Sequence, residues 1–189
     1  MLKKIKILSE TPVFQGYTKV YEAKIEENGN NVYTREKVVR PDAAVGLIYN
    51  TETENVVLIK QFRYPTFSET NDGYLIEAIA GVVDKGENPK QTFIRESFEE
   101  AGYKLEEKDV VFCFSCFATP GYSTEKLHYF LATATNSSKI KNAGGGLKSE
   151  NENIEVVEIH KTQFKTMINS FQDSKTKLLA LEAFCRNFF

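Results

Sequence analysis

The stretch between Asn88 and Gly102 constrains this chain more than any other part of its sequence. Asn88 can cap the start of a helix, Pro89 suits the first turn, and Gly102 suits the end. We therefore expect one helix over Pro89 to Ala101. Helical spacing gives it an inward side made of Ile94, Phe98 and Ala101. A folded domain must bury that side and leave the opposite, acidic side for another use.

The acidic side carries Glu96, Glu99 and Glu100. Glu96 and Glu100 are four residues apart on one face, where like charges repel unless something neutralises them. Hard divalent cations do so, because Mg²⁺ prefers carboxylate oxygens, backbone carbonyls and water. Such cations also bridge phosphate oxygens and lower the pKa of bound water. An isolated glutamate pair is usually only a solvated helix face, so the pair alone does not decide between the two readings.

The surrounding segment decides in favour of a metal site. It fits the pattern G-x5-E-x7-R-E-U-x-E-E-x-G-U, in which the seven fixed positions are Gly81, Glu87, Arg95, Glu96, Glu99, Glu100 and Gly102. At ordinary residue frequencies such a match arises by chance about once in 10⁸ to 10⁹ windows. The segment resembles the box of the Nudix hydrolases. Ser97 departs from the pattern, which prefers an aliphatic residue there, and we expect this to weaken helix packing slightly without touching a metal ligand.

The resemblance implies a role for each of these residues. The ligands that it implies for Mg²⁺, or for Mn²⁺ as a substitute, are Glu96, Glu100 and the Ala80 carbonyl, with Glu99 in support. Arg95 and Glu87 look like an orienting pair that holds the carboxylates in place. Gly81 and Gly102 are expected to supply backbone conformations that bulkier residues cannot adopt.

Outside the box, the resemblance covers about Val38 to the C-terminus. The series QFRYP, YLIEAIAGVVD, TPGYSTEKLHYF and NAGGGLKSENENIEVVEI is similar to the ADP-ribose pyrophosphatase branch, and its last stretch to nucleoside diphosphate sugar hydrolases that act on GDP-mannose or UDP-glucose. By that analogy Glu125 lies near the substrate and Glu152 is the candidate general base, with Glu150 the competing choice. Arg63 is a candidate phosphate ligand, although an arginine at a strand end is as often a surface or interface group.

The remaining pattern predicts an α/β/α sandwich on a mixed sheet, preceded by an antiparallel β-ribbon. The ribbon falls in residues 1–40, with strands at Tyr17–Ile25 and Val32–Val39 around an Asn28-Gly29 hairpin turn. We expect it to serve as a dimerisation element. The hydrolase domain, residues 41–189, is expected to have strands at 43–49, 55–62, 74–83, 110–117, 127–134 and 154–159 and helices at 162–170 and 175–188. Leu178, Leu179 and Leu181 are expected to face inward, and Asn142–Asn153 to be a mobile loop.

Composition excludes several classes of partner. The chain has 189 residues, 26% of them charged, and a formal net charge of only -2. Nucleic-acid and anionic-membrane binders usually carry a basic excess, so neither partner is expected. The sequence shows no signal-peptide or transmembrane run, which favours a soluble, cytoplasmic protein. Cys113 and Cys116 are expected to be reduced core residues on opposite faces of a buried strand.

The sequence therefore predicts a homodimeric enzyme that uses divalent metal to hydrolyse the pyrophosphate bond of a small nucleotide sugar. Its products would be a nucleoside monophosphate and a sugar phosphate. Two alternatives remain open: a Nudix enzyme that acts on nucleoside triphosphates or RNA caps, and a fold that binds a ligand without turnover. The intact carboxylate set argues against the second, and the ribbon, the triple glycine and the lack of basic surface argue against the first.

Overall fold

The computed structural model describes residues 4–147, 149 and 152–189. The chain divides into two compact units. One comprises Met1–Asp42 with Cys116–Leu127, and the other comprises Ala43–Ser115 with His128–Phe189. The expected division after residue 40 did not assign Cys116–Leu127 to the N-terminal part, because that segment lies far along the chain. Within the described residues, no helix is long and apolar enough to cross a membrane.

The N-terminal unit contains a three-stranded antiparallel sheet in the order β1-β2-β3. Its strands are β1 (Ile5–Gln15), β2 (Lys19–Glu27) and β3 (Asn31–Val39). Asn28 and Gly29 join β2 to β3 with φ angles of 57° and 77°, as the expected hairpin turn requires. The sequence missed β1 because every residue of that strand is exposed, so it has no buried face to produce an alternating pattern.

The second unit is built on a sheet in the order β10-β5-β4-β9-β8. These strands are β4 (Ala43–Asn50), β5 (Asn55–Phe62), β8 (Val110–Phe117), β9 (Lys126–Ala134) and β10 (Glu155–His160). The apolar run expected as one strand is two, β6 (Tyr74–Glu77) and β7 (Ile79–Val82). β6 pairs with β5, whereas β7 pairs with β4, so the chain changes partner at Ala78.

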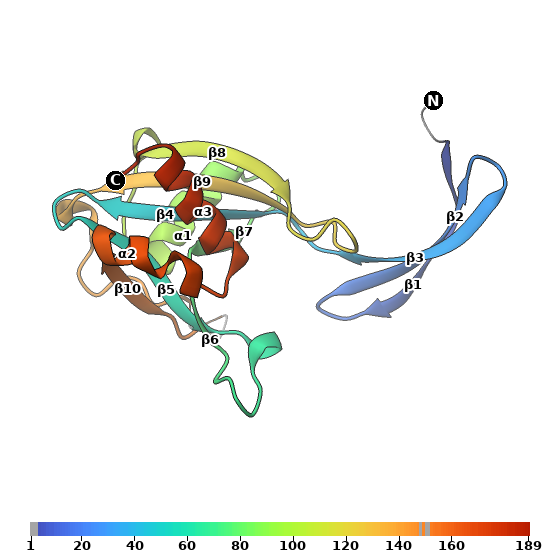
Figure 1. Ribbon diagram of the computed structural model, residues 1–189, viewed down its shortest axis with the longest axis horizontal. Helices are drawn as coiled ribbons and strands as arrows, with labels where there is room; N and C mark the ends of the chain where they lie inside the picture. Colours follow the sequence, from blue (N-terminus) through green and yellow to red (C-terminus); the bar gives the residue numbers. More distant parts are fainter. Residues whose placement is uncertain (1–3, 148, 150–151) are drawn as a thin grey trace. The chain divides into compact units, whose positions relative to one another are not determined.

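The helices of this unit are α1 (Pro89–Glu99), α2 (Lys161–Met167) and α3 (Ser174–Cys185). A Cβ on Gly46 of β4 would lie 2.2 Å from the Phe93 ring of α1, so the glycine makes room for that ring. Three residues later, the Tyr49 ring packs on Phe188 and Phe189, which follow α3. Residues three apart on a strand point to opposite faces, so α1 and the C-terminal segment cover opposite sides of the sheet (Figure 1).

The expected inward faces were only partly right. Ala101 is buried and Ile94 packs against the core, as expected, but Phe98 is 44% exposed. The buried residues within α1 itself are Thr92, Phe93 and Ser97. The helix turns this side to the sheet because the Phe93 ring stacks on Phe130, with ring centroids 5.7 Å apart. Ser97 is fully buried and its hydroxyl donates to the Phe93 carbonyl at 2.7 Å, so the small residue fits close packing. On α3 only Leu179 of the three leucines is buried, while Leu178 and Leu181 are exposed.

The cysteines are free, but they are not core residues. Cys113 and Cys116 are partly buried and Cys185 is exposed. β8 is the last strand in the sheet order, and its residues Val111, Phe112 and Phe117 are all exposed. An apolar run at a sheet edge thus looks the same in the sequence as a central strand, which is why burial was overestimated there.

Helix α3 is tied to the sheet by a buried polar chain. Asp173 caps the helix, and its Oδ2 accepts hydrogen bonds from the Thr176 N–H and hydroxyl at 2.9 and 2.6 Å. The same Thr176 oxygen accepts the N–H of Ala78 at 2.7 Å. Burial favours a raised pKa for Asp173, but the charge and hydrogen bond of Lys175, together with the bonds from Thr176, lower its pKa. These hydrogen bonds hold Ala78 in place, and Ala78 is the residue at which the partner strand changes from β5 to β4.

We predict that Thr176→Val lowers the free energy of unfolding by about 1–3 kcal/mol, because the buried Ala78 N–H loses its acceptor while side-chain shape is kept. Urea denaturation measures the effect. Thr166→Val is the matched control, since that threonine is exposed and its hydroxyl bonds only to a nearby carbonyl in its own helix. Equal losses in the two variants would contradict the structural role of Thr176.

Candidate functional site

The helix that carries the glutamates begins as its sequence indicates. The Asn88 side chain accepts the Gln91 N–H at 3.0 Å, and the Gln91 side chain accepts the Asn88 N–H at 3.3 Å. This reciprocal pair is a capping box, and Pro89 follows in the first turn. The helix ends at Glu99, with Glu100 as its cap and Gly102 in the left-handed region at φ 73°. The helix thus begins where the sequence indicates and ends two residues earlier than expected.

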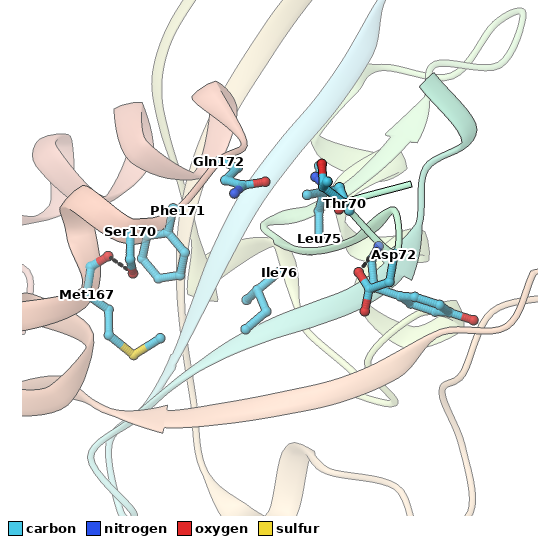
Figure 2. Close-up of a pocket in the computed structure, with 10 residues that line it drawn as sticks. Thr70, Asp72, Leu75, Ile76, Met167, Ser170, Phe171 and Gln172 are labelled. Carbon is cyan, nitrogen blue, oxygen red and sulfur yellow. Dashed lines mark hydrogen bonds between the residues drawn. The ribbon is translucent and has the colours of Figure 1, made fainter. Parts of the chain in front are cut away.

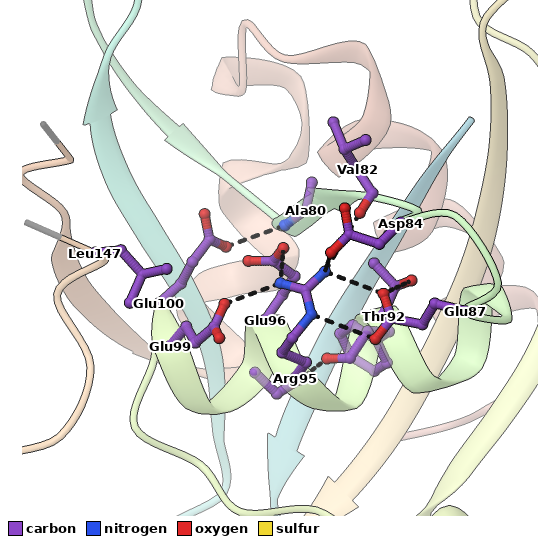
Figure 3. Close-up of polar contacts among 12 residues, drawn as sticks. Ala80, Val82, Asp84, Glu87, Thr92, Arg95, Glu96, Glu99, Glu100 and Leu147 are labelled. Atoms are coloured by element: carbon purple, nitrogen blue, oxygen red, sulfur yellow. Dashed lines mark hydrogen bonds and ion pairs between the residues drawn. The ribbon is translucent and has the colours of Figure 1, made fainter. Parts of the chain in front are cut away.

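Arg95 lies at the centre of the acidic residues (Figure 3). Its Nη1 donates to Glu96 at 2.7 Å and to Glu99 at 2.9 Å. Its Nε and Nη2 donate to the two carboxylate oxygens of Glu87 at 3.3 and 3.2 Å. Burial by itself would lower the pKa of Arg95, but the bonds and charges of these glutamates raise it. The expected pairing of Arg95 with Glu87 is present, and the same guanidinium also orients Glu96 and Glu99.

Glu96 and Glu100 are carboxylates with too little compensating charge. Glu100 is 2% exposed, and its Oε2 accepts the N–H of Ala80 at 3.1 Å. Burial and then the charge of Glu96 raise the pKa of Glu100 well above its usual range. Burial also raises the pKa of Glu96 despite the attraction of Arg95. In a medium of low dielectric constant, such a pair attracts a cation strongly.

This donor set fits a divalent cation. Among the described residues, no three acidic, histidine or cysteine side chains are arranged to hold one ion between them. A magnesium ion does not need three, because it usually keeps several waters and takes one or two carboxylates from the protein. Glu96 and Glu100 could supply these. The Ala80 N–H on β7 bonds Glu100, while the Ala80 carbonyl stays a predicted ligand. Burial, followed by the charges of neighbouring carboxylates, raises both pKa values, and a bound cation would offset this cost.

The two glycines of the box act differently from one another. Gly102 has a positive φ, as expected. Gly81 does not, and the expectation of a special backbone conformation there was wrong. A Cβ on Gly81 would lie 1.8 Å from Oε1 of Glu96. Gly81 is therefore needed because the Glu96 carboxylate lies directly against its backbone.

Arg63, the expected phosphate ligand, forms a salt bridge with a residue that the sequence did not single out. Its Nε and Nη2 donate to the Glu77 carboxylate at 3.1 and 2.7 Å, and Glu77 is 2% exposed. Burial would lower the pKa of Arg63, but Glu77, followed by the charges of Glu100 and Asp173, raises it. The signal was available, because Glu77 is the one charged residue within the apolar run YLIEAIAGVV.

The two loop glutamates lie in different units. Glu125 belongs to the N-terminal unit, where its Oε1 is 3.9 Å from Nε of Arg40. Glu152 belongs to the unit that contains α1. A Cβ on Gly146 would lie 2.7 Å from Oε2 of Glu152, and the Gly146 N–H donates to the Glu99 carbonyl at 3.0 Å, so Glu152 lies near the C-terminal end of α1. Its charge also contributes to the raised pKa of both Glu96 and Glu100. Glu150, the competing candidate, lies outside the described residues.

Comparison with known proteins places this geometry in a family. Residues 39–179 match the NUDIX domain. The chain belongs to the NUDIX family. It is 41% identical over 157 residues to the GDP-mannose pyrophosphatase of Citrobacter koseri, covering 81% of this chain and 79% of that protein. It is 38% identical over 181 residues to the GDP-mannose pyrophosphatase of Escherichia coli strain K12, covering 94% and 91%.

The fold agrees with this assignment. The crystal structure of an ADP compounds hydrolase matches this NUDIX chain with a TM-score of 0.79 at 18% identity, covering 100% of this chain and 95% of that one. The expected α/β sandwich with an antiparallel N-terminal sheet is confirmed. Because the identity is low, this second likeness concerns the fold alone.

A cleft of about 580 Å³ lies elsewhere in the second unit, between the segment before β6 and the connection from α2 to α3 (Figure 2). Polar groups of Asp72, Ser170 and Gln172 line it beside the apolar side chains of Ile76 and Phe171. None of its lining residues is among the residues to which the sequence gave a chemical role. The cleft therefore does not coincide with the carboxylate cluster.

We predict that Arg63→Met lowers the free energy of unfolding by about 3–5 kcal/mol at neutral pH, because it leaves the buried Glu77 without its partner. The double variant Arg63→Met/Glu77→Gln should recover part of this loss, as urea denaturation would measure. Lys108→Met is the control: its ammonium is also 2.7 Å from a carboxylate, that of Glu106, but both side chains are exposed, so the change should be much smaller. No recovery in the double variant would contradict the pairing.

Proposed function

We propose that this chain hydrolyses the pyrophosphate bond of a nucleoside diphosphate sugar of the GDP-mannose or ADP-ribose type, giving a nucleoside monophosphate and a sugar phosphate. The observation that carries the proposal is the pair formed by the half-buried Glu96 of α1 and the buried Glu100 that caps this helix, within a NUDIX domain. The proposed substrate class is supported by relatives named GDP-mannose pyrophosphatase, which are 38–41% identical over most of the chain. The proposal includes a divalent cation, Mg²⁺ with Mn²⁺ as a substitute, and a cytoplasmic location.

The residues of this chain divide the work between them. Glu96 and Glu100 hold the cation with the Ala80 carbonyl, and Arg95 keeps Glu96, Glu99 and Glu87 in place. When bound, the cation supplies neutralisation of charge on the diphosphate and lowers the pKa of a bound water. Glu152 accepts the proton of the attacking water. Catalysis of this kind depends on positioning and charge neutralisation, and it needs no nucleophilic side chain.

Substrate selection is assigned to Arg63 and Glu125. Arg63 presents its remaining nitrogen, Nη1, to a phosphate oxygen while Glu77 holds the other edge of the guanidinium. Glu125 recognises a sugar hydroxyl or a neutral base edge and repels the extra charge of a terminal phosphate. The proposal therefore distinguishes this chain from NUDIX enzymes that act on nucleoside triphosphates.

The decisive experiment compares turnover of GDP-mannose, ADP-ribose, UDP-glucose and dGTP by the purified protein. We expect a nucleoside diphosphate sugar to be the best substrate, activity to vanish with a chelator, and Mg²⁺ or Mn²⁺ to restore it. If dGTP is the best substrate, the branch assignment is wrong and the NUDIX chemistry stands. Full activity in the chelator would instead overturn the metal mechanism.

Glu100→Gln should reduce turnover by about 10²-fold or more, because it removes one preorganised charge while keeping side-chain shape. The amide oxygen can still accept the Ala80 N–H, so the thermal unfolding midpoint should change little. The exposed Glu106 provides the matched control, and Glu106→Gln should leave turnover unchanged. A near-normal rate for Glu100→Gln would show that the metal is held elsewhere.

We further propose a homodimer that uses the N-terminal sheet. β1 exposes apolar side chains along its length, among them Ile5, Ile7, Val13 and Phe14, each more than half exposed. A small sheet without a core of its own needs packing to persist, and contiguous exposed apolar surface commonly marks an interface. A second copy of this chain is the partner proposed to cover it.

Multi-angle light scattering should give the mass of two chains for the natural sequence. Val13→Glu combined with Phe14→Glu places charges on both faces of β1 and should shift the protein toward one chain. The control Glu22→Lys changes an exposed charge on the neighbouring strand and should leave the mass unchanged. A monomeric and fully active natural protein would contradict the proposed dimer.

A further inference from the structure

The C-terminal end of α1 is closed by two separate parts of the chain. The last four carbonyls of a helix have no partner within it. Gly102 and Tyr103 donate their N–H groups to the carbonyls of Phe98 and Ser97 at 3.0 and 2.9 Å. The carbonyls of Glu99 and Glu100 are bonded instead by residues more than forty positions later in the chain.

Those residues are the consecutive glycines Gly144–Gly146, here called the glycine segment. Gly145 donates to the Glu100 carbonyl at 2.8 Å, and Gly146 donates to the Glu99 carbonyl at 3.0 Å. The three φ angles are 89°, 97° and 79°, a run that side chains with a Cβ rarely adopt. The mobile loop expected over Asn142–Asn153 therefore includes a part that is hydrogen-bonded to the catalytic helix.

The contact between the glycine segment and α1 is backbone against backbone. A Cβ on Gly144 would lie 2.8 Å from the Gly102 nitrogen and 2.9 Å from the Ala101 carbonyl carbon. A Cβ on Gly102 would lie 2.6 Å from the Ala143 oxygen. Two chain segments can approach this closely only where both lack side chains, so Gly102 and Gly144 act as a matched pair.

The same segment holds Glu152. The Leu147 N–H donates to Oε2 of Glu152 at 3.1 Å, and the Glu152 N–H donates to the Leu147 carbonyl at 3.3 Å. A Cβ on Gly146 would lie 2.7 Å from both the Cβ and Oε2 of Glu152. The Ile154 N–H closes the far side by donating to the Gly145 carbonyl at 3.1 Å. The carboxylate is thus fixed one residue away from the bonds to α1.

We propose that the glycine segment is a positioning element, which fixes the Glu152 carboxylate beside Glu96 and Glu100 by docking backbone N–H groups on the end of α1. The inference rests on the proposed function, in which Glu152 accepts the proton of the attacking water. The backbone does this work because a side chain at Gly146 would occupy the place of the carboxylate itself. In this inference the segment acts on the reaction through Glu152.

The first test is Gly146→Ala, whose added methyl group displaces the Glu152 side chain. We expect turnover of the preferred nucleotide sugar to fall by about 10- to 10²-fold, because displacing a reacting group by about 1 Å has effects of that size. The Michaelis constant should change little, since a general base acts as the transition state forms. Gly145→Ala is the second variant, because a Cβ there meets only the Ile154 oxygen at 3.7 Å and the change is confined to backbone conformation.

Gly29→Ala is the control for strain alone. Gly29 has a φ of 77°, close to that of Gly146, and a Cβ there would meet nothing within 4 Å. It lies at the tip of the hairpin between β2 and β3. Turnover should therefore be unchanged in Gly29→Ala, while any loss of stability due to the positive φ should resemble that of Gly145→Ala.

A double-variant cycle separates positioning from general damage. Glu152→Gln should lower turnover, and adding Gly146→Ala to it should cause little further loss. If Gly146→Ala lowers turnover by the same factor in both backgrounds, the glycine acts otherwise and the inference is wrong. If Glu152→Gln keeps the natural turnover, Glu152 is not the general base and the proposed function is wrong on that point. This result differs from equal losses in both backgrounds, so the two failures can be told apart.

Hydrogen exchange gives a readout that does not depend on activity. In the metal-free protein, the amides of Gly145 and Gly146 should be protected, and Gly146→Ala should increase exchange in the peptide that spans residues 142–154. Glu152→Gln should leave the protection of Gly145 and Gly146 in place, because the docking bonds are made by backbone groups. Rapid exchange at both glycines in the natural protein would overturn the inference.

Discussion

The burial of Glu100 beside other carboxylates at the end of α1 is the constraint on which the rest of this structure depends. Glu100 is 2% exposed, and this burial, followed by the charges of Glu96 and Glu152, raises its pKa. The Arg95 guanidinium balances the negative charge of Glu96, and the backbone N–H of Ala80 donates a hydrogen bond to Glu100. Such an arrangement costs folding free energy in the absence of a cation, so the surrounding elements must hold it rigidly.

That requirement explains why the site is surrounded by backbone contacts rather than by large side chains. Gly81 lets the Glu96 carboxylate approach the β7 backbone, and Gly102 lets the chain turn sharply after α1. Arg95 of α1 orients Glu96 and Glu99, the Ala80 N–H of β7 meets Glu100, and the Leu147 N–H after the glycine segment meets Glu152. Preorganisation of this kind removes the need to reorder groups as charge develops.

The sequence predicted the parts of this protein that depend on local spacing. Helix α1, its cap at Asn88 and the link between Arg95 and Glu87 were all predictable, because the groups that form these contacts are only three or eight residues apart in the sequence. Pairings across the chain were not. The change of strand partner at Ala78, the salt bridge from Glu77 to Arg63 and the exposed edge strand β8 depend on long-range packing that leaves little trace in local pattern. Burial of Glu100 was missed for the same reason, since a charged residue gives no apolar signal.

The change of strand partner at Ala78 also couples the two sides of the sheet. Glu77 precedes this residue and holds Arg63, and Ala80 follows it and holds Glu100. Between them, the Ala78 N–H is fixed by Thr176 of α3, which packs on the face opposite α1. The position of the carboxylate cluster thus depends on α3, a helix that contributes no residue to the cluster. Changes to the C-terminal helix that spare every site residue would still shift the catalytic geometry, so this remote surface offers a way to tune turnover without altering the chemistry.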